Sequence, residues 1–422
     1  MKILTISLLL SCTLYSNFIF ANDVYLKDIS GSNYLIPNKK SAELGIGWVR
    51  DNLSWSDIEV KPGTYDWSAF DKKVLAAKAE NLQMLPILAY TPAWNRSNPI
   101  KKSSPPENYD SWNKFVTAAI NHYTAAPFNI HYYQLWNEPT PQAKFWLGST
   151  SDYIDKIYIP AAKIIRASGG KVVFGGWPIS NSLKEFETTL DHNNAWKYTN
   201  IIDFHYGLAK YYTELYEKYV ITHKVDGIWQ TELGYKAGPL LLSRTYVSVL
   251  SWATLHNWDS SDKYKVFWYP AWANGAGAQK ALTMPGPNKQ IIYTDNGNEL
   301  KVLNEIFGTG AISAYSTITL DGSDGSITKI DSFKVGGNKI VFAPWFDNSI
   351  FDMSGKNEFV ISILKQNNFK NIKIISPNGS ILPYNKTDNN KFIKMAINKS
   401  DLNNICASCS KDRLIYVVVE TD

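Results

Sequence analysis

The sequence predicts an α/β fold, namely a (β/α)8 TIM barrel with a C-terminal antiparallel β-sandwich domain. From about residue 43 to residue 300, apolar runs typical of buried parallel strands alternate with helical patterns. Beyond about Ala311, short runs alternate apolar and polar residues, and turn signals such as Val335-Gly-Gly-Asn338 separate them. We therefore expect a barrel over residues 22–310 and a β-sandwich over residues 311–422.

Seven barrel strands follow from their apolar runs. They are residues 44–50, 82–89, 132–137, 171–176, 201–205, 227–231 and 265–268, with helical patterns such as 70–80 and 111–122 between them. Residues 24–29 are the only candidate for the missing first strand, and pairing of residues 22–42 with the C-terminal domain is the alternative. An open, doubly wound sheet is the alternative to a barrel, but it expects a Gly-rich first turn that this sequence lacks.

The C-terminal domain is expected to contain short strands separated by turns. The candidate strands are residues 312–320, 339–345, 359–364, 372–375 and 414–420. No internal repeat and no long low-complexity linker is present, so we expect the two domains to pack directly on each other.

The composition is that of an ordinary globular protein, with 45% hydrophobic and 19% charged residues among 422. Its aromatic content of 14%, with 15 Trp and 25 Tyr, is more than a core needs. Flat rings with one polar tip suit the faces of sugars, so a carbohydrate groove is a reasonable hypothesis. The net charge is +5, and no cluster of Lys or Arg stands out, so nucleic-acid binding is unsupported.

Residues 1–21 have the order of a secretory signal peptide: a charged start at Lys2, an apolar middle and a small residue at Ala21. We therefore expect a secreted or periplasmic protein with no stable membrane span after cleavage; an uncleaved anchor is the alternative. Only Cys406 and Cys409 remain in the processed chain, and a small local disulfide is expected. A metal site would need two further ligands, and none is spaced nearby.

Two glutamates follow apolar strand patterns. His131-Tyr-Tyr-Gln-Leu-Trp-Asn-Glu-Pro-Thr140 ends in Asn-Glu-Pro, and because proline cannot continue a strand ladder, Glu138 is left at the strand tip. Glu232 has a similar position in Gly227-Ile-Trp-Gln-Thr-Glu232-Leu-Gly234. In a TIM barrel these tips carry the chemistry, and two carboxylates facing one cleft can break a glycosidic bond. An ordinary helix start, capped by Asn137, is the alternative for the first motif.

The surroundings of the two glutamates suggest separate roles. Arg50 ends an apolar strand, where a charge needs a partner, and could hold Glu232 ionised; a plain surface arginine is the alternative. Trp136 beside Glu138 would favour the protonated form that a general acid requires. Asn137 can donate to a sugar hydroxyl next to the reacting carbon.

Further strand-end residues are candidates for substrate binding. His205 or Tyr206 could hydrogen-bond the second glutamate and set its orientation, although a satisfied core histidine is the alternative. Trp268 could form the floor of a sugar site, and Trp94 and Trp177 are loop aromatics that suit either packing or binding. No Gly-x-Ser-x-Gly elbow, phosphate loop or His-Glu-x-x-His helix is present, so we expect neither a metal nor a cofactor.

With these motifs the chain resembles the clan A glycoside hydrolases, and within them family 39. The resemblance rests on Trp48-Val-Arg-Asp-Asn-Leu-Ser-Trp55, on Ile58-Glu-Val-Lys-Pro-Gly-Thr-Tyr-Asp-Trp67, and on Leu85-Pro-Ile-Leu-Ala-Tyr-Thr-Pro-Ala-Trp94, together with the Asn-Glu-Pro motif. It covers roughly residues 43–300, and it extends to bacterial members that cut biofilm exopolysaccharide.

This resemblance implies a retaining barrel enzyme with Glu138 as acid/base and Glu232 as nucleophile. The residues that fall on nucleophile- or sugar-binding positions are Arg50, Asn137, His205, Tyr206 and Trp268. We therefore expect a glycosidase that cleaves a bacterial exopolysaccharide internally. The rival is a non-catalytic carbohydrate-binding barrel in exopolysaccharide assembly or export, and transglycosylation through the same intermediate is a third interpretation.

Overall fold

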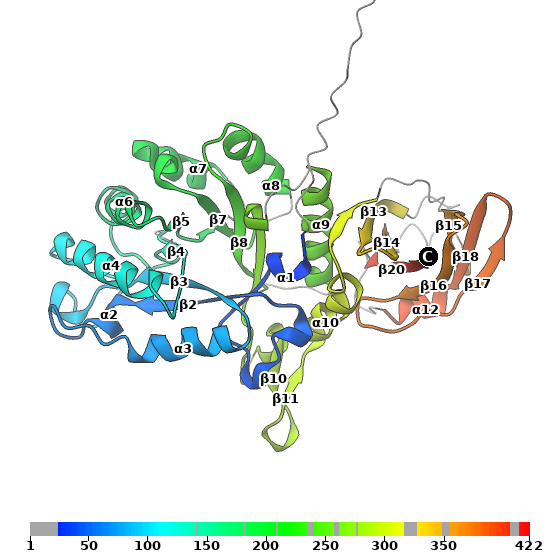
Figure 1. The fold of residues 1–422 in the computed structure, drawn as a ribbon, viewed down its shortest axis with the longest axis horizontal. Helices are drawn as coiled ribbons and strands as arrows, with labels where there is room; N and C mark the ends of the chain where they lie inside the picture. The colour runs from blue at the N-terminus through cyan, green and yellow to red at the C-terminus, as the bar shows by residue number, and fades with distance from the viewer. Residues whose placement is uncertain are drawn as a thin grey trace, which may run out of the picture.

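The computed structural model describes residues 24–140, 142–179, 183–207, 210–234, 240–256, 261–275, 277–315, 327–347, 355–405 and 413–422. The expected signal peptide and the Cys406–Cys409 pair lie outside the described residues. A closed parallel barrel and a separate antiparallel sandwich lie side by side, which confirms the predicted fold class (Figure 1). In the part of the chain that the structure describes, no helix is both long and apolar enough to cross a membrane.

The barrel sheet has the order β5-β4-β3-β2-β1-β9-β8-β7-β6 and closes where β5 also pairs with β7. All of its pairings are parallel, and the two-residue strand β6 extends the fifth barrel strand. Its strands are β1 (Ser30–Asn33), β2 (Trp48–Ser54), β3 (Gln83–Ala89), β4 (Tyr132–Leu135), β5 (Lys171–Val173), β6 (Trp177–Pro178), β7 (Ile201–His205), β8 (Gly227–Leu233) and β9 (Tyr264–Trp268).

Helices cover the outside of the barrel (Figure 1). The longest, α4, begins at a cap in which Asn108 accepts from the Asp110 backbone N–H, and it buries Trp112, Phe115 and Ile120 on one face. The barrel-domain helices are α1 (Leu26–Ile29), α2 (Trp55–Ile58), α3 (Ser68–Ala79), α4 (Tyr109–Thr124), α5 (Thr150–Asp152), η4 (Tyr153–Tyr158), α6 (Ile159–Ala167), α7 (Lys184–Asp191), α8 (Lys210–Leu215), η6 (Tyr216–Val220), α9 (Leu241–Leu255) and α10 (Asp295–Phe307). Between β9 and α10 the hairpin β10 (Thr283–Pro285) and β11 (Ile291–Tyr293) protrudes from the barrel (Figure 1).

The prediction for the first strand was wrong. Residues 26–29 form the short helix α1, and the strand is the polar segment Ser30–Asn33, which pairs with β2 and β9. Val24 instead makes an antiparallel bridge to Ile312, so the alternative of pairing with the C-terminal region holds for that residue. The strand β1 has no apolar pattern because its glycine lies against the Phe267 ring and its polar side chains are hydrogen-bonded, Ser30 to Tyr246 of α9 and Asn33 to Thr231 O.

The C-terminal domain is a sandwich of two antiparallel sheets. One has the order β12-β13-β14-β20-β16, with β19 beside β14, and the other has the order β15-β18-β17. Apolar side chains between the sheets, such as Phe342, Val417, Ile361 and Met395, form its core. The strands are β12 (Ile312–Ala314), β13 (Ile327–Val335), β14 (Lys339–Phe346), β15 (Glu358–Leu364), β16 (Phe369–Ile375), β17 (Asn385–Asp388), β18 (Phe392–Asn398), β19 (Arg413–Leu414) and β20 (Tyr416–Thr421), with the helix α12 (Lys399–Asn403) after β18.

The two domains share an apolar interface. The outer face of the larger sheet joins the barrel core, and the ring of Phe307 in α10 packs edge-on against Phe333 and Tyr416. Within this interface the buried Glu299 of α10 accepts hydrogen bonds from the backbone N–H and the hydroxyl of Ser243 in α9, at 3.0 and 2.8 Å. Direct packing of the domains was expected from the sequence.

Candidate active site

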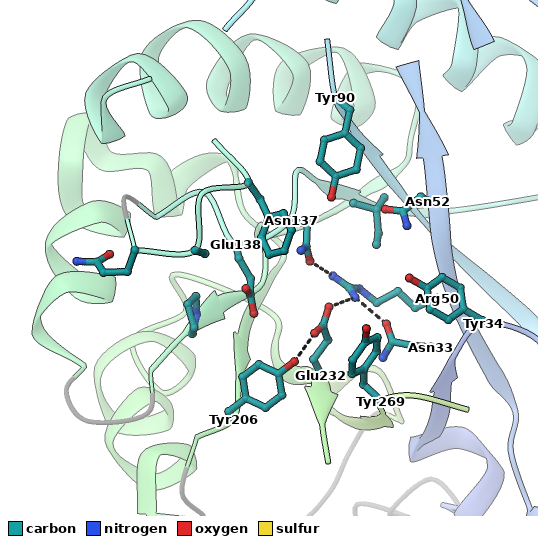
Figure 2. A pocket seen from close by; sticks show the side chains of 15 residues that line it. Asn33, Tyr34, Arg50, Asn52, Tyr90, Asn137, Glu138, Tyr206, Glu232 and Tyr269 are labelled. Carbon is teal, nitrogen blue, oxygen red and sulfur yellow. Dashed lines mark hydrogen bonds and ion pairs between the residues drawn. The ribbon is translucent and has the colours of Figure 1, made fainter. Parts of the chain in front are cut away.

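A cavity of about 710 Å³ opens at the C-terminal ends of the barrel strands (Figure 2). Its lining comes from β1, β2, β3, β6 and β8 and from the segments that follow β1, β3, β4, β7 and β9, so it collects residues from around the barrel. It is lined by Asn33, Tyr34, Arg50, Asn52, Ile87, Tyr90, Asn137, Glu138, Gln142, Ala143, Phe145, Pro178, Tyr206, Glu232 and Tyr269.

Glu138 reaches the cavity because the chain turns sharply after β4. Trp136 and Glu138 both adopt positive φ, at 69° and 42°, which is uncommon for residues with a side chain. The Trp136 N–H donates to Leu88 O and the Glu138 N–H donates to Gly175 O, so backbone hydrogen bonds to two neighbouring segments hold this turn. The Trp136 ring packs behind the turn in the apolar core rather than lining the cavity.

Glu232 lies near the end of β8, opposite Glu138 across the cavity (Figure 2). Arg50 Nη1 donates to its Oε1 at 2.6 Å, and the Tyr206 hydroxyl donates to its Oε2 at 2.5 Å. Burial raises the pKa of Glu232, but the charges of His205 and Arg50 and the Tyr206 hydrogen bond outweigh burial and bring this pKa below its ordinary value. Glu232 is therefore held as a carboxylate.

All three nitrogens of the Arg50 guanidinium donate hydrogen bonds within the site. Besides Glu232, its guanidinium donates to the side-chain oxygens of Asn33 at 2.7 Å, Gln134 at 2.6 Å and Asn137 at 2.6 Å. The side chain is 2% exposed, so the expectation of a paired arginine at the barrel mouth is met and the plain surface alternative is excluded. The bond to Asn137 also fixes the orientation of that amide at the cavity wall.

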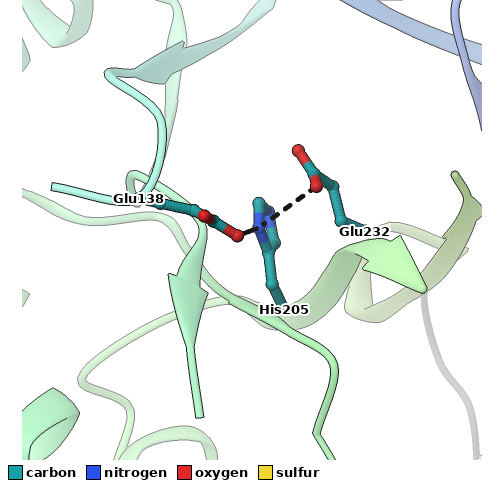
Figure 3. Close-up of side chains that lie close together, drawn as sticks. All are labelled: Glu138, His205 and Glu232. Carbon is teal, nitrogen blue, oxygen red and sulfur yellow. Dashed lines mark hydrogen bonds and ion pairs between the residues drawn. The ribbon is translucent and has the colours of Figure 1, made fainter. Parts of the chain in front are cut away.

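His205 lies between the two glutamates (Figure 3). Its Nδ1 is 2.8 Å from Glu138 Oε1 and 3.8 Å from Glu232 Oε2, and the ring is completely buried. Burial lowers the pKa of His205, but Glu232, the hydrogen bond to Glu138 and the charge of Asp203 together raise it above its ordinary value. The nearest ligand atoms of the two glutamates lie within 4.8 Å of each other.

A third buried carboxylate, Asp203, lies beneath this group, and sequence reasoning missed it. Its Oδ1 accepts from the Thr231 N–H at 2.9 Å and its Oδ2 from the Thr231 hydroxyl at 2.6 Å, while the Gln134 amide also donates to Oδ2. The signal for Asp203 in the sequence is a charge inside the otherwise apolar run Ile201-Ile-Asp-Phe.

Several lining residues were also not predicted. Among them Tyr34 and Tyr90, like the predicted Tyr206, follow strand ends with positive φ, at 70°, 72° and 54° respectively, a costly conformation for a large side chain that tends to persist at functional sites. The lining residues absent from the sequence prediction are Asn33, Tyr34, Asn52, Ile87, Tyr90, Gln142, Ala143, Phe145, Pro178 and Tyr269. Tyrosine directly after a strand end, as in Ala89-Tyr90 and Trp268-Tyr269, is the signal that could have found some of them.

Four of the predicted substrate-binding residues do not line this cavity: His205, which is buried beside the two glutamates, and three tryptophans. Trp268 is completely buried and its indole N–H donates to Lys280 O. Trp177 is 1% exposed and packs against Phe186. Trp94 packs edge-on against Trp55 and donates to Glu59 O. The structure therefore places Trp94, Trp177 and Trp268 as packing residues, because indole rings at strand ends fill the space between the barrel and its helices.

Among the described residues, Glu138, His205 and Glu232 form the one group whose composition and spacing could suit a metal ion. However, both oxygens of Glu232 already accept hydrogen bonds, and the Arg50 guanidinium lies 2.6 Å from one of them. A divalent cation would have to compete with that fixed positive charge, so the donor set does not fit a metal. The arrangement fits acid–base chemistry with one ionised carboxylate.

Comparison of the whole chain with solved structures finds proteins of similar fold. A family 39 glycoside hydrolase from the gut symbiont Bacteroides cellulosilyticus WH2 matches with a TM-score of 0.62 and 15% identity, over 94% of this chain and 82% of that one. The chain shares its fold with this enzyme and with the family 30 xylanase described next. A family 30 subfamily 8 xylanase from Clostridium acetobutylicum matches with a TM-score of 0.60 and 14% identity, over 96% and 98% of the chains. SrfJ from Salmonella typhimurium matches with a TM-score of 0.56 and 11% identity, over 95% and 91%.

Sequence comparison finds no matching family model and no matching curated protein. The resemblance is confirmed at the level of the fold, which the chain shares with solved glycoside hydrolases.

Proposed function

We propose that this protein is a retaining glycoside hydrolase in which Glu138 is the acid/base and Glu232 is the nucleophile. The observation that carries the proposal is the approach of the two carboxylates to within 4.8 Å across one cavity. Retaining enzymes hold their carboxyl groups about 5–5.5 Å apart, whereas inverting enzymes need about 6.5–9.5 Å to admit a water molecule. The short separation favours direct attack by a carboxylate.

The environments of the two glutamates support the division of roles. Arg50 and Tyr206 stabilise negative charge on Glu232, which a nucleophile needs. Glu138 Oε1, by contrast, faces the His205 ring at 2.8 Å. In the first step the Glu232 carboxylate attacks the anomeric carbon, the glycosidic C–O bond breaks, and the departing oxygen takes the proton of Glu138.

In the second step the bond between Glu232 and the sugar is broken. Glu138, now a carboxylate, removes a proton from water, and the resulting hydroxyl attacks the anomeric carbon. The C–O bond to Glu232 breaks, so Glu138 is again protonated and Glu232 is again ionised. The Asn137 amide, oriented by Arg50, is the donor that we assign to the sugar hydroxyl beside the reacting carbon.

We further propose that the substrate is a bacterial exopolysaccharide, cut internally, and that the protein is secreted or periplasmic. The signal-like segment at residues 1–21 supports export. Tyr34, Tyr90, Phe145 and Tyr269 line the cavity and offer rings for several sugar units. Proteins of similar fold include an endoxylanase from Clostridium papyrosolvens, so xylan belongs in the substrate panel.

The test is to incubate the purified full chain with xylan and a panel of bacterial exopolysaccharides, and to follow new reducing ends and product masses. Activity that falls about 10²-fold or more in Glu138→Gln and Glu232→Gln supports the proposal. Glu299→Gln is the matched control, because the same chemical change there lies outside the cavity and should leave turnover intact. Labelling by an activated 2-fluoro sugar should disappear in Glu232→Gln; persistent labelling would place the nucleophile elsewhere. Binding of glycans with no cleavage would favour the non-catalytic barrel instead.

A further inference from the structure

Asp203 is connected to both glutamates through two chains of hydrogen bonds. On one side the Thr231 hydroxyl donates to Asp203 Oδ2 at 2.6 Å and lies 3.1 Å from His205 Nε2, whose ring in turn contacts Glu138. On the other side Gln134 donates to Asp203 and accepts from Arg50, which binds Glu232. Asp203 itself is 0% exposed and does not line the cavity, so it cannot touch a substrate.

The direction of these hydrogen bonds fixes one proton on His205. Because the Thr231 hydroxyl gives its hydrogen to Asp203, its oxygen is left to accept, and the partner that it accepts from is the Nε2–H of His205. The other ring nitrogen, Nδ1, faces Glu138 Oε1 at 2.8 Å. If Nδ1 also carries a proton, it donates to Oε1 and leaves Glu138 Oε2 to carry the proton that goes to the leaving group.

The charges of the buried group favour this arrangement. Arg50 and His205 can supply two positive charges, and Asp203, Glu138 and Glu232 can supply three negative ones. A buried group with net charge is costly, so two cations are best matched by two anions and one protonated carboxyl. Arg50 and Tyr206 hold Glu232 as an anion, and three donated hydrogen bonds favour the ionised form of Asp203. The remaining proton then belongs to Glu138.

We propose that Asp203 is a positioning residue that keeps the Glu138–His205 pair doubly protonated, so that Glu138 enters the reaction as an acid. This inference rests on the proposed function for the role of Glu138, but the protonation that it describes can be measured without any substrate. Removal of the Asp203 charge leaves the doubly protonated pair with an uncompensated positive charge. The pair should then lose its first proton at a lower pH.

The other titratable groups that face these buried charged residues do not change the balance of two cations and two anions. From the neighbouring elements, the phenols Tyr34, Tyr90, Tyr153, Tyr206 and Tyr212 face Asp203 or the glutamates, and burial raises the pKa of each of them. They therefore stay neutral through the working range. Burial raises the pKa of Asp203 to about 6, against the lowering effects of His205, Arg50 and Thr231. The charge of Asp203 should accordingly act above about pH 6 and vanish below it.

The first experiment follows the protonation of His205 by NMR in the full chain labelled with ¹⁵N-histidine, with His205→Asn used to assign its signals. In the wild type both ring nitrogens should be protonated at neutral pH. In Asp203→Asn the loss of this proton should move to lower pH by about one unit, a tenfold change in proton affinity. Thr231→Val removes the hydroxyl link and should also move the pH at which His205 loses this proton downward. Thr231→Ser keeps the hydroxyl and should leave that pH unchanged.

The second experiment measures the pH dependence of kcat/KM on the polysaccharide that yields the most reducing ends in the panel above. The basic limb should move to lower pH in Asp203→Asn and Thr231→Val, and the profiles of Asp203→Asn and wild type should converge below about pH 6. A purely structural role would lower the rate at every pH without moving the limb.

An unshifted His205 titration in folded Asp203→Asn, or a neutral His205 at pH 7 in the wild type, would overturn the inference. Should Asp203→Asn fail to fold, the Thr231→Val and Thr231→Ser pair decides by the same titration. If the His205 titration shifts in Asp203→Asn but the wild type cleaves no glycan, only the proposed function is contradicted. If the wild type is active but the His205 titration does not shift, only this inference is contradicted.

Discussion

The ring of Phe267 occupies the space where a side chain on Gly31 would lie. A Cβ built on Gly31 would be 2.3 Å from Phe267 Cδ1, closer than side-chain atoms approach one another. Gly31 pairs with Trp48 of β2 and with Phe267 of β9. This contact therefore lies at the seam where the first and last strands of the barrel, β1 and β9, pair with each other. Closure therefore depends on the absence of a side chain at one position of a strand that lacks an apolar pattern.

We expect Gly31→Ala to destabilise the protein by about 1–3 kcal/mol, because the added methyl group overpacks the seam. Thermal unfolding would show this as a lower Tm. Gly337→Ala is the control, since no atom lies within 4 Å of a Cβ at that turn. Gly31→Ala combined with Phe267→Leu should recover part of the loss. An unchanged Tm in Gly31→Ala would show that the seam has room to adjust.

Tyr206→Phe should move the acidic limb of the pH–rate profile upward by about one to two units. The Tyr206 hydroxyl donates to Glu232 and stabilises its ionised form, so its removal raises the pKa of Glu232. Glu232 then becomes ionised only at higher pH, and activity at acidic pH falls. The measurement is kcat/KM against pH, with Tyr133→Phe as a control for loss of a buried hydroxyl outside the cavity. A limb that stays in place would mean that Tyr206 does not tune the nucleophile.

Arg50→Lys should reduce kcat/KM by about 10²-fold or more despite keeping a positive charge. The planar guanidinium of Arg50 reaches four acceptors, in or just after β1, β4 and β8, and a lysine ammonium cannot reproduce that geometry. Steady-state kinetics on the active polysaccharide would show the loss. Activity within a few-fold of wild type would mean that charge alone suffices.

Substitutions of aromatic residues should separate binding from packing. Tyr34 lines the cavity and is 39% exposed, so Tyr34→Ala should raise KM about two- to tenfold with little change in Tm. Trp177 is 1% exposed, so Trp177→Ala should instead lower the free energy of unfolding by about 3–5 kcal/mol. The opposite pattern, with KM sensitive to Trp177 and stability sensitive to Tyr34, would restore the sugar-binding role predicted for Trp177.

Glu299, which is buried at the domain interface, should make the free energy of unfolding depend on pH. Burial raises the pKa of Glu299 to about 7, so between its ordinary value and about pH 7 the folded protein binds a proton that the unfolded chain releases. Stability from this group is present at acidic pH and is lost as pH rises through 7. Glu299→Gln should flatten Tm between pH 5 and pH 8, and a wild-type slope retained in the variant would assign the dependence to another group.

Much of the barrel could be predicted because its strands are buried on both faces and read as continuous apolar runs. The first strand could not, since Ser30–Asn33 is stabilised by backbone pairing and by polar contacts such as Asn33 to Thr231 O, neither of which leaves an apolar pattern. Hydrophobic patterning instead pointed to residues 24–29, where Val24 pairs with Ile312 and the apolar side chains of Leu26 and Ile29 belong to a short helix.

The site was predictable where the sequence interrupts a strand. Proline after Glu138 and the charge of Arg50 in an apolar run both mark the barrel mouth. The tryptophans misled because a large ring near a strand end suits packing and sugar binding equally well. Asp203 and Gln134 were hidden because they lie within strands, where only the folded barrel shows that their side chains meet beneath the cavity.

Because β1 pairs with residue 48 on one side and with residue 266 on the other, the barrel seam joins parts of the chain that are synthesised far apart. Until residue 266 is available, strands β1 and β8 each keep an unpaired edge, and no closed barrel can form. Closure of the barrel therefore waits for the synthesis of β9 at residues 264–268, well past the middle of the chain. The bridge from Val24 to Ile312 then ties the N-terminal end of the described chain to the second domain.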